Sequence, residues 1–399
     1  MKDQTRDNTA VIIGYCRTAF AKTSPKKPGF FSDLNPVNMQ VPLVNALLDR
    51  TGLDPQHVKK VITGAVHQEA DQGLNIARLL VLHKDCHLLD TTAGTTLDMF
   101  CASSMEAIAM ADGQIARHPD SVYIVTGVQS MSHIPMGGLN PELSEKVESG
   151  NVAGFMNMPI TAENLAEIYN VSRLEQDRFS LGSHKKLAAA QEAGYLKNEI
   201  VPLEGLDYDD GVRSDTSMEG LARLRTVAKD GGTVTAGNAS QVTDGASAMM
   251  LTSQAFATKN NLPVMARIIG TGETGVAPEI MGIGPVKASI NALKHAGITM
   301  NDIGAIELNE AFAAQSLAVL KEWDVRGMAV DRDKVNIDGG AIAMGHPLGA
   351  TGARLVGHLA EIMNRQNLQY GLATLCIGGG QGKAVVLENP NFVPEKPAM

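Results

Sequence analysis

The chain has 399 residues, of which 44% are hydrophobic, 19% are charged and 40 are glycine. The apolar content excludes a disordered chain, and four cysteines are too few for a disulfide scaffold. The net charge of −9 argues against a nucleic-acid partner or an anionic-membrane surface. Because no apolar run is long enough to span a bilayer, we expect no transmembrane segment and a cytoplasmic protein with reduced thiols.

Strand and helix patterns alternate through the first part of the chain. Short apolar runs with β-branched residues predict strands, and apolar residues at helical spacing predict the helices between them. In chain order the predicted elements are a strand at 10–15, a helix at 41–50, a strand at 58–64, a helix at 103–117 and a strand at 121–127. This alternation predicts an α/β fold in which helices cover a largely parallel sheet.

The composition changes between residues 130 and 252, where charged residues, Asn and irregular Gly/Asp stretches become common. Arg173 to Ala193 has the pattern of one long amphipathic helix. Ser172 and Glu175 form a capping-box pattern at its start. We interpret this region as an inserted loop-and-helix subdomain that forms a lid or ligand wall.

The strand–helix alternation returns after this region. The predicted elements are a strand at 265–270, a helix at 288–296, a strand at 303–308, a helix at 349–364 and a strand at 372–377. A shift of 245 residues lays Gly52 on Gly297 and Cys101 on His346. We interpret this as an internal duplication, with an N-terminal half at 1–129, the insert at 130–252 and a C-terminal half at 253–399.

Cys101 is the first residue that could carry chemistry. It lies where an extended segment turns into a helix, and a helix N-terminus lowers the pKa of a thiol and favours the thiolate. The small residues that follow it would let a substrate approach. The alternative is a buried, inert cysteine.

Two further candidates lie in glycine-rich turns of the second half. His346 stands between Gly345 and Pro347, and a histidine there can act as a base near neutral pH. Cys376 ends an apolar strand just before a run of three glycines, whose N–H groups could surround an oxyanion. The alternatives are a histidine placed for packing and a core cysteine.

Asn309 and Glu310 follow the strand predicted at 303–308, so their side chains either enter a site or cap the next helix. No Cys-x-x-Cys pair, His-Glu-x-x-His motif or other metal-ligand spacing is present. Cysteine, asparagine and histidine at matched junctions of two halves favour covalent thiol chemistry without a tightly bound cofactor or metal.

An ordered set of motifs makes the chain resemble the thiolase family from near its N-terminus to about Asn389. The motifs are Arg17-Thr18-Ala19-Phe20, Gln72-Gly-Leu-Asn-Ile-Ala-Arg78, Cys101-Ala-Ser-Ser-Met105, Thr161-Ala-Glu-Asn164, Gly232-Thr-Val-Thr-Ala-Gly-Asn-Ala-Ser240, Asp244-Gly-Ala246, Met281-Gly-Ile-Gly-Pro285, Asn309-Glu-Ala-Phe312, Gly345-His-Pro-Leu-Gly349 and Cys376-Ile-Gly-Gly-Gly-Gln-Gly382. They look closest to the bacterial β-oxidation branch. The resemblance implies a duplicated five-layered α-β-α-β-α fold with an inserted loop domain.

The resemblance also implies catalytic roles. Cys101 would be the acylated nucleophile, His346 the base that takes its proton, and Cys376 the acid/base for acetyl-CoA and CoA. The N–H groups of Cys101 and Gly378 would form one oxyanion hole. His346 and a water molecule held by Asn309 would form the other.

Coenzyme A would be a substrate together with 3-ketoacyl-CoA. The resemblance places Arg213 near the adenine, Ser240, Ala311 and Phe312 along the pantetheine, and Met158 and Met281 at the acyl group. It implies a homodimer or homotetramer, and an association with a hydratase/dehydrogenase subunit of β-oxidation.

The resemblance implies a 3-ketoacyl-CoA thiolase (acetyl-CoA C-acyltransferase). One alternative is an acetoacetyl-CoA thiolase working in the Claisen direction. Another is a non-catalytic acyl-CoA- or lipid-binding protein, which would be expected to lack Cys101, His346 or Cys376. A ketoacyl synthase is disfavoured because Cys376 precedes the glycine run.

Asp98 departs from the family pattern, which often has Asn three residues before the nucleophile.

Overall fold

The computed structural model describes residues 7–24, 26–142 and 157–394. The first half contains strands and helices that alternate as predicted. They are β1 (Ala10–Arg17), β2 (Ala21–Lys22), α2 (Pro36–Thr51), β3 (Val58–Ala65), α3 (Ile76–Val81), β4 (Ala93–Leu97), α4 (Ser103–Arg117) and β5 (Val122–Ser130). The insert then supplies α6 (Met158–Ile168), α7 (Arg173–Glu192) and α8 (Met218–Ala222).

The remaining elements complete the sheet and its covering helices. They are β6 (Thr243–Ser253), α9 (Gln254–Lys259), β7 (Ala266–Gly275), α10 (Gly284–Ala296), β8 (Ala305–Leu308), α11 (Ala313–Val325), α12 (Ala341–Met344), α13 (Leu348–Arg365), β9 (Tyr370–Ile377) and β10 (Gln381–Glu388). Short 3₁₀ turns lie at Pro55–His57, Ala70–Gln72, Pro278–Ile283, Met300–Asp302 and Arg332–Lys334.

The strands run in the order β4-β3-β5-β6-β1-β7-β10-β9-β8, and β2 pairs with β6 outside this path. Strands β3, β4 and β5 are parallel, as are β8 and β9, whereas the pairs of β6 and β10 with their neighbours are antiparallel. The two halves of the sheet meet where β1 pairs with β7 over two residues, Val11 and Ile12. The sheet is therefore mixed rather than largely parallel.

Five layers of helix and sheet give the molecule its core. Helices α4 and α13 contact each other and lie between the two halves of the sheet, whereas α2 and α3 cover the outside of the first half and α10 that of the second. Close approach of the two central helices depends on Gly352, because a Cβ there would lie 2.4 Å from the backbone N of Met105. The structure therefore has the predicted five-layered α-β-α-β-α fold.

The duplication is visible in how two helices end. Helix α2 ends at Gly52 with φ of 63°, and helix α10 ends at Gly297 with φ of 71°. Both glycines adopt the left-handed conformation that ends helices, and each is followed by a 3₁₀ turn and a parallel strand. The same local device at equivalent places supports the predicted repeat.

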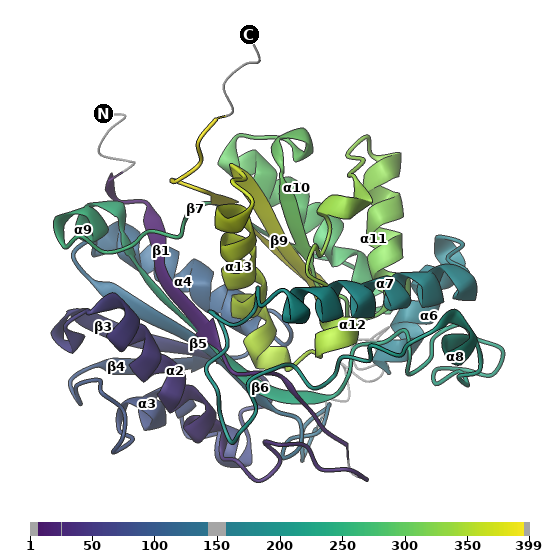
Figure 1. Ribbon diagram of the computed structural model, residues 1–399, viewed down its shortest axis with the longest axis horizontal. Coiled ribbons are helices and arrows are strands. Elements are labelled where there is room, and N and C mark those ends of the chain that lie inside the picture. The colour runs from purple at the N-terminus through teal and green to yellow at the C-terminus, as the bar shows by residue number, and fades with distance from the viewer. Residues whose placement is uncertain (1–6, 25, 143–156, 395–399) are drawn as a thin grey trace.

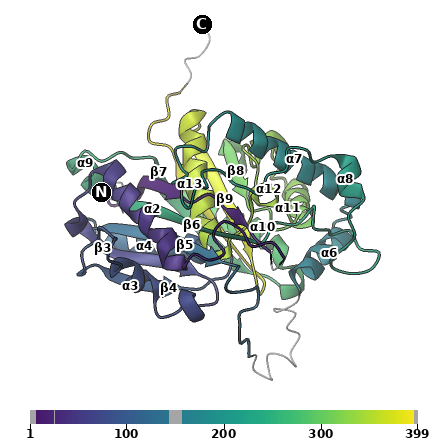
Figure 2. The same ribbon diagram turned by 60° about the horizontal axis from the view of Figure 1, so that its bottom comes forward.

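The insert lies beside the second half, where α7 contacts α11 and α12, and both views show this (Figures 1 and 2). Helix α7 begins as predicted, since Ser172 and Glu175 form the complete capping box. Arg17, which is fully buried, joins the insert to β1 by donating to Glu199 and Asp209 at 2.7 and 2.6 Å. The insert is therefore tied to the first half by buried charge pairs.

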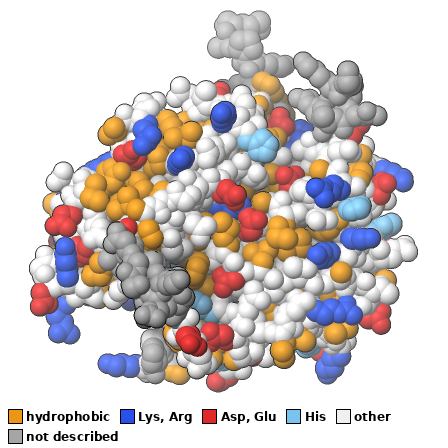
Figure 3. Space-filling model, turned by 180° about the vertical axis from the view of Figure 1, so that it is seen from behind, with side chains coloured by type: hydrophobic (Ala, Val, Ile, Leu, Met, Phe, Trp, Pro, Cys, Tyr) orange, Lys and Arg blue, Asp and Glu red, His pale blue; other side chains and the backbone are white. Residues whose placement is uncertain are grey.

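On the face shown in Figure 3, Lys and Arg side chains are interspersed with Asp and Glu rather than gathered in one field. Among the helices of the described residues, none combines the length and apolar content that a bilayer requires. The same residues contain no group of three or more His, Cys, Asp or Glu side chains that could hold a metal ion.

Candidate active site

A tight turn holds Cys101 just before helix α4. The preceding residue, Phe100, has φ of 46°, a left-handed conformation that is strained for a non-glycine residue. Two side chains hold it there: Asp98 Oδ1 accepts the Phe100 N–H at 2.8 Å, and Ser103 Oγ donates to the Phe100 carbonyl at 2.7 Å. These two hydrogen bonds hold the turn that places Cys101 just before helix α4.

Cys101 is 9% exposed, and burial raises its pKa to about 11. The negative charge of Asp98 also raises this pKa, whereas hydrogen bonding to the backbone at Gly378 and at Cys101 lowers it. The low pKa that the sequence predicted for Cys101 is therefore wrong. Desolvation of the thiolate outweighs the N–H donors, and helix α4 begins only at Ser103.

Cys376 lies near Cys101. It is the second-last residue of the buried strand β9, and only Ile377 separates it from the turn at 378–380. Burial raises its pKa strongly, and the charge of a Cys101 thiolate raises it further. The backbone of Gly378 on the same turn reaches Cys101. The end of strand β9 and the turn that follows it therefore place Cys376 and an N–H donor near Cys101.

His346 reaches the site from the segment before helix α13. It follows Gly345, whose φ is 106° and where a Cβ would lie 2.2 Å from Thr243. His346 Nε2 lies 3.3 Å from Asn309 Nδ2. Burial first, and then the positive charge of Arg354, lower the pKa of His346 to about 3. The imidazole is therefore neutral near pH 7 and able to accept a proton.

Asn309 and Glu310 do not cap the next helix, because α11 begins at Ala313. Asn309 N donates to the Thr374 carbonyl of β9 at 3.0 Å, which aligns the end of β8 with the strand that carries Cys376. Glu310 is buried, and its carboxylate accepts from Ser183 Oγ at 2.6 Å and Asn336 Nδ2 at 2.8 Å. Asn309 thus points at His346, whereas Glu310 ties the site to the insert.

Most of the residues predicted to bind coenzyme A gather around Cys376. A buried apolar cluster that Met158 partly covers contains Met281, Ala311, Phe312 and Cys376. Ser240 adjoins this cluster, since its N–H donates to the Ala311 carbonyl at 2.9 Å. The structure therefore brings the predicted pantetheine and acyl residues to the second thiol.

Arg213 lies outside that cluster and is exposed on a loop of the insert. Its N–H donates to His184 Nδ1 at 3.2 Å. Burial first, and then the charges of Arg213 and Lys22, lower the pKa of His184 to about 4. Arg213 and Lys22 therefore supply positive charge at the outer end of the candidate site.

Sequence reasoning gave no role to two residues that support His346. Thr351 Oγ1 lies 2.7 Å from His346 Nδ1. Gln241 accepts the His346 N–H with its carbonyl at 3.4 Å, and its side chain donates to the carbonyls of Ile342 and Ala343. Thr351 stands five residues after the histidine, in the first turns of a predicted helix, and this spacing is the signal that could have identified it.

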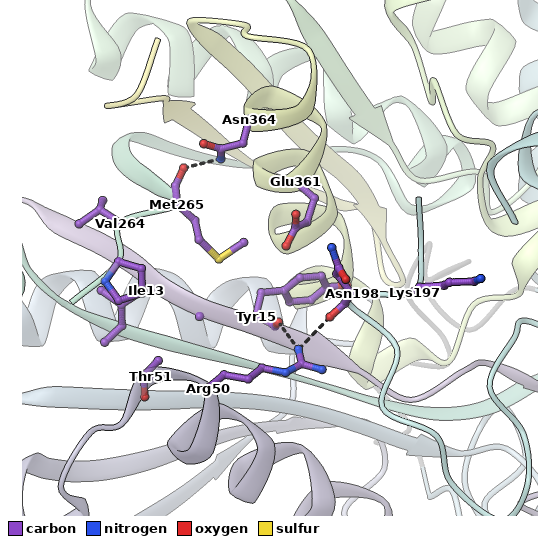
Figure 4. Close-up of a pocket in the computed structure, with 12 residues that line it drawn as sticks. Ile13, Tyr15, Arg50, Thr51, Lys197, Asn198, Val264, Met265, Glu361 and Asn364 are labelled. Atoms are coloured by element: carbon purple, nitrogen blue, oxygen red, sulfur yellow. Dashed lines mark hydrogen bonds between the residues drawn. The ribbon is translucent and has the colours of Figure 1, made fainter. Parts of the chain in front are cut away.

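A pocket of about 500 Å³ opens elsewhere on the surface, between β1, the end of α2 and the end of α13 (Figure 4). Its lining includes Arg50, Lys197 and Glu361 and none of the predicted site residues. Arg50 Nη1 donates to the backbone carbonyls of Asn198 at 2.9 Å and Tyr15 at 3.4 Å. The Arg50 hydrogen bonds therefore hold the backbone around the pocket.

The duplicated five-layered fold thus holds two neighbouring thiols, Cys101 and Cys376, and a neutral His346 beside Asn309. Groups of these kinds can carry out thiol-based acyl chemistry. Comparison with known proteins names the family. Residues 10–255 match the model of the thiolase N-terminal domain, and residues 262–389 match that of the thiolase C-terminal domain. The chain therefore belongs to the thiolase family, whose members are acyltransferases.

Its relatives span almost the whole chain. A 3-ketoacyl-CoA thiolase of Stutzerimonas stutzeri is 40% identical, over 95% of this chain and 98% of the relative. A 3-ketoacyl-CoA thiolase of Acinetobacter baylyi is 42% identical, over 95% of this chain and 97% of the relative.

Solved structures agree with this assignment. Human mitochondrial 3-ketoacyl-CoA thiolase in complex with CoA has a TM-score of 0.85 at 34% identity, over 96% of this chain and 98% of that one. Bacillus anthracis acetyl-CoA acetyltransferase has a TM-score of 0.85 at 35% identity, with the same coverage. The family models divide the chain near residue 260, and the three-part division at 129 and 252 stays a prediction.

Proposed function

We propose that the chain is a 3-ketoacyl-CoA thiolase, which cleaves 3-ketoacyl-CoA with CoA to acetyl-CoA and a shortened acyl-CoA. The observation that carries the proposal is a pair of buried thiols, Cys101 and Cys376, beside the backbone of Gly378, with His346 next to Asn309, whose N–H bonds to the strand that carries Cys376. A non-catalytic acyl-CoA carrier would not need both thiols and the histidine. The names of relatives about 40% identical to the chain support the substrate class.

In the first step, the Cys101 thiol proton passes to His346 Nε2 and the thiolate sulfur attacks the 3-keto carbon. His346 is suited to this transfer because burial keeps it neutral beforehand. The negative oxygen that forms would accept from the N–H groups of Cys101 and Gly378, or from His346 and a water molecule held by Asn309. Such donors, fixed before the reaction, stabilise developing charge without reorganisation.

In the second step, the bond between C2 and C3 breaks and the acyl group stays on Cys101. The carbanion of acetyl-CoA takes the proton of the Cys376 thiol, which becomes a thiolate. Because burial raises the pKa of Cys376, this thiolate is a strong base. It removes the proton of incoming CoA, whose sulfur attacks the acyl-cysteine. The bond between the acyl carbon and the Cys101 sulfur breaks, the shortened acyl-CoA leaves, and the Cys101 thiolate takes its proton back from His346.

Coenzyme A would lie from Arg213 at the outer end, past Ser240, Ala311 and Phe312, to the thiols. The cationic pair Arg213 and Lys22 suits a phosphate-bearing group. The buried apolar cluster with Met281, which Met158 partly covers, suits an uncharged pantetheine and acyl chain. Coenzyme A enters as a substrate, and we propose no tightly bound cofactor.

A second candidate is the acetoacetyl-CoA thiolase reaction in the condensing direction. The similarity to an acetyl-CoA acetyltransferase at 35% identity favours it. Both reactions use the same acyl-cysteine, so the acyl pocket and the reactant concentrations separate them.

Steady-state cleavage of acetoacetyl-CoA and of longer 3-ketoacyl-CoAs, followed at the thioester absorbance, tests the proposal. Cleavage that becomes faster with longer chains supports the 3-ketoacyl-CoA reaction. A strong preference for acetoacetyl-CoA supports the second candidate. Absence of cleavage with every chain length would overturn both and favour the carrier.

We also propose that the chain forms a homodimer or homotetramer through the free edge of β4. This strand ends the sheet order, is only partly buried, and adjoins exposed leucines around α3, among them Leu74 with 87% exposure. An unpaired edge beside apolar side chains suits a second copy. Sedimentation of the protein and of Leu74→Lys tests this, since a monomer in the unaltered protein would contradict it.

A cytoplasmic location and an association with a hydratase/dehydrogenase subunit remain predictions from the family resemblance.

A further inference from the structure

The Thr351 hydroxyl contacts the ring of the candidate base and the backbone of its own helix. Thr351 is fully buried in the second turn of α13. Its Oγ1 lies 2.7 Å from His346 Nδ1 and 3.0 Å from the Pro347 carbonyl. A hydroxyl carries one proton and two acceptor lone pairs, so it can donate only one of these hydrogen bonds.

The Thr351 hydroxyl donates to the Pro347 carbonyl, as in the usual bond from a helical threonine to the carbonyl four residues before it. The same carbonyl also accepts from the N–H groups of Ala350 and Thr351. The Thr351 lone pairs then face His346 Nδ1, which must carry the hydrogen and donate. Which nitrogen of a neutral histidine is protonated is set by the hydrogen bond that the other nitrogen makes.

The opposite side of the ring agrees with this assignment. Asn309 Nδ2, an amide donor, faces His346 Nε2 at 3.3 Å. Nε2 can accept that bond only if it has a lone pair, and it has one when the hydrogen is on Nδ1. With the Asn309 amide in this orientation, Thr351 and Asn309 both favour the tautomer that carries the hydrogen on Nδ1.

We propose that Thr351 is a positioning residue that keeps the His346 hydrogen on Nδ1, so that Nε2 stays free to take the Cys101 proton. The role of His346 as the base rests on the proposed function, but its tautomer can be measured without turnover. When Nε2 gains the proton, both ring nitrogens carry hydrogen. The Thr351 oxygen then stabilises the cation by accepting a hydrogen bond from Nδ1. The Thr351 hydroxyl continues to donate its hydrogen bond to the Pro347 carbonyl.

The main test compares Thr351→Val, which keeps the shape but removes the hydroxyl, with Thr351→Ser, which keeps the hydroxyl. Without an acceptor for a buried N–H, the hydrogen moves to Nε2 or the cation loses support. We expect kcat of Thr351→Val to fall by about tenfold to hundredfold. KM for CoA stays unchanged, because Thr351 does not contact the proposed CoA channel, and Thr351→Ser keeps most of the activity.

Helix α9 offers a matched control. Thr258 is exposed, and its hydroxyl donates to the Gln254 carbonyl at 2.8 Å, the same bond within a helix but with no histidine beside it. Thr258→Val removes an equivalent hydroxyl and should leave kcat unchanged. A structural effect of losing this kind of bond would lower activity in both variants and overturn the proposal.

The tautomer is measured directly with ¹⁵N-histidine-labelled protein at neutral pH, with His346→Asn used to assign the signal. A protonated Nδ1 in the unaltered protein and a shift toward protonated Nε2 in Thr351→Val support the proposal. Protonated Nε2 in the unaltered protein, or equal kcat in Thr351→Val, overturns it. If no acyl-CoA is turned over at all, the proposed function has failed, and the nitrogen shifts still decide the tautomer.

Discussion

Arg354 Nη1 lies 2.5 Å from Glu307 Oε2, and both side chains are 1% exposed. The pair joins helix α13, which follows His346, to strand β8, which ends just before Asn309. Arg354 also lowers the pKa of His346. One buried ion pair thus holds the two elements that bring the histidine and the asparagine together.

Glu307→Gln should destabilise the protein, because it leaves the Arg354 charge buried without its partner. We expect the free energy of unfolding to fall by about 3–5 kcal/mol, measured by urea denaturation. Burial raises the pKa of Glu307, so the measurement is made at about pH 8 rather than at a lower pH, where protonation would weaken the pair. Asp324→Asn breaks the exposed pair with Arg332 and serves as the control, with an expected loss below about 1 kcal/mol. Equal losses in the free energy of unfolding would show that the buried pair contributes no more to stability than the exposed pair.

Cys101→Ser should abolish both turnover and the mass increase of an acylated protein. A serine hydroxyl is a far weaker nucleophile than a thiolate, and nothing else in the proposed mechanism can hold the acyl group. Cys86→Ser is the matched control, because Cys86 is a partly exposed free thiol outside the candidate site. Acyl trapping that persists in Cys101→Ser would refute the assigned nucleophile.

Alkylation of Cys101 by iodoacetamide should speed up with pH well beyond pH 9, because burial raises its pKa to about 11. Asp98→Asn removes a negative charge that raises this pKa, so it should speed alkylation at a fixed pH of about 8. The carboxylate also holds Phe100 and His67 by their N–H groups, which an amide oxygen can do for one of them. A flat pH profile, or no acceleration in Asp98→Asn, would contradict this account.

His358 should make stability fall as the pH rises. It is buried between Glu199 at 2.9 Å and Asp338 at 3.3 Å, and these carboxylates raise its pKa from 6.5 to about 10 against the effect of burial. The stabilisation that protonated His358 gives the folded protein is fully present below 6.5, the pKa of histidine in the unfolded chain. It is lost as the pH rises through about 10, the pKa of His358 in the folded protein.

Urea midpoints measured between about pH 7 and pH 10 test this. His358→Gln should lower the midpoint at pH 7 and flatten its dependence on pH. The exposed His118→Gln leaves both unchanged. If the urea midpoint of His358→Gln still falls with rising pH as in the unaltered protein, another group causes this dependence and the prediction is wrong.

Local patterns predicted much of the fold. Helices α2 and α10 end at left-handed glycines, and α7 begins with a capping box. These features depend on residues close together in the sequence, so a local pattern is enough to predict them. Other features depend on contacts between distant segments. The mixed sheet, in which β1 lies between β6 and β7, could not be predicted, because it pairs residues more than two hundred positions apart.

The sequence by itself singled out Cys101, His346, Cys376 and Asn309 as candidates, because each occupies a junction with a distinctive local motif. Only the tertiary structure decided their state. Burial raises the pKa of Cys101, where the sequence predicted a lower value, and it keeps His346 neutral. Thr351 gained its role in the same way, from the geometry at the start of α13. A motif specifies which groups are present, whereas desolvation and hydrogen-bond partners, which set their protonation, depend on how the whole chain packs.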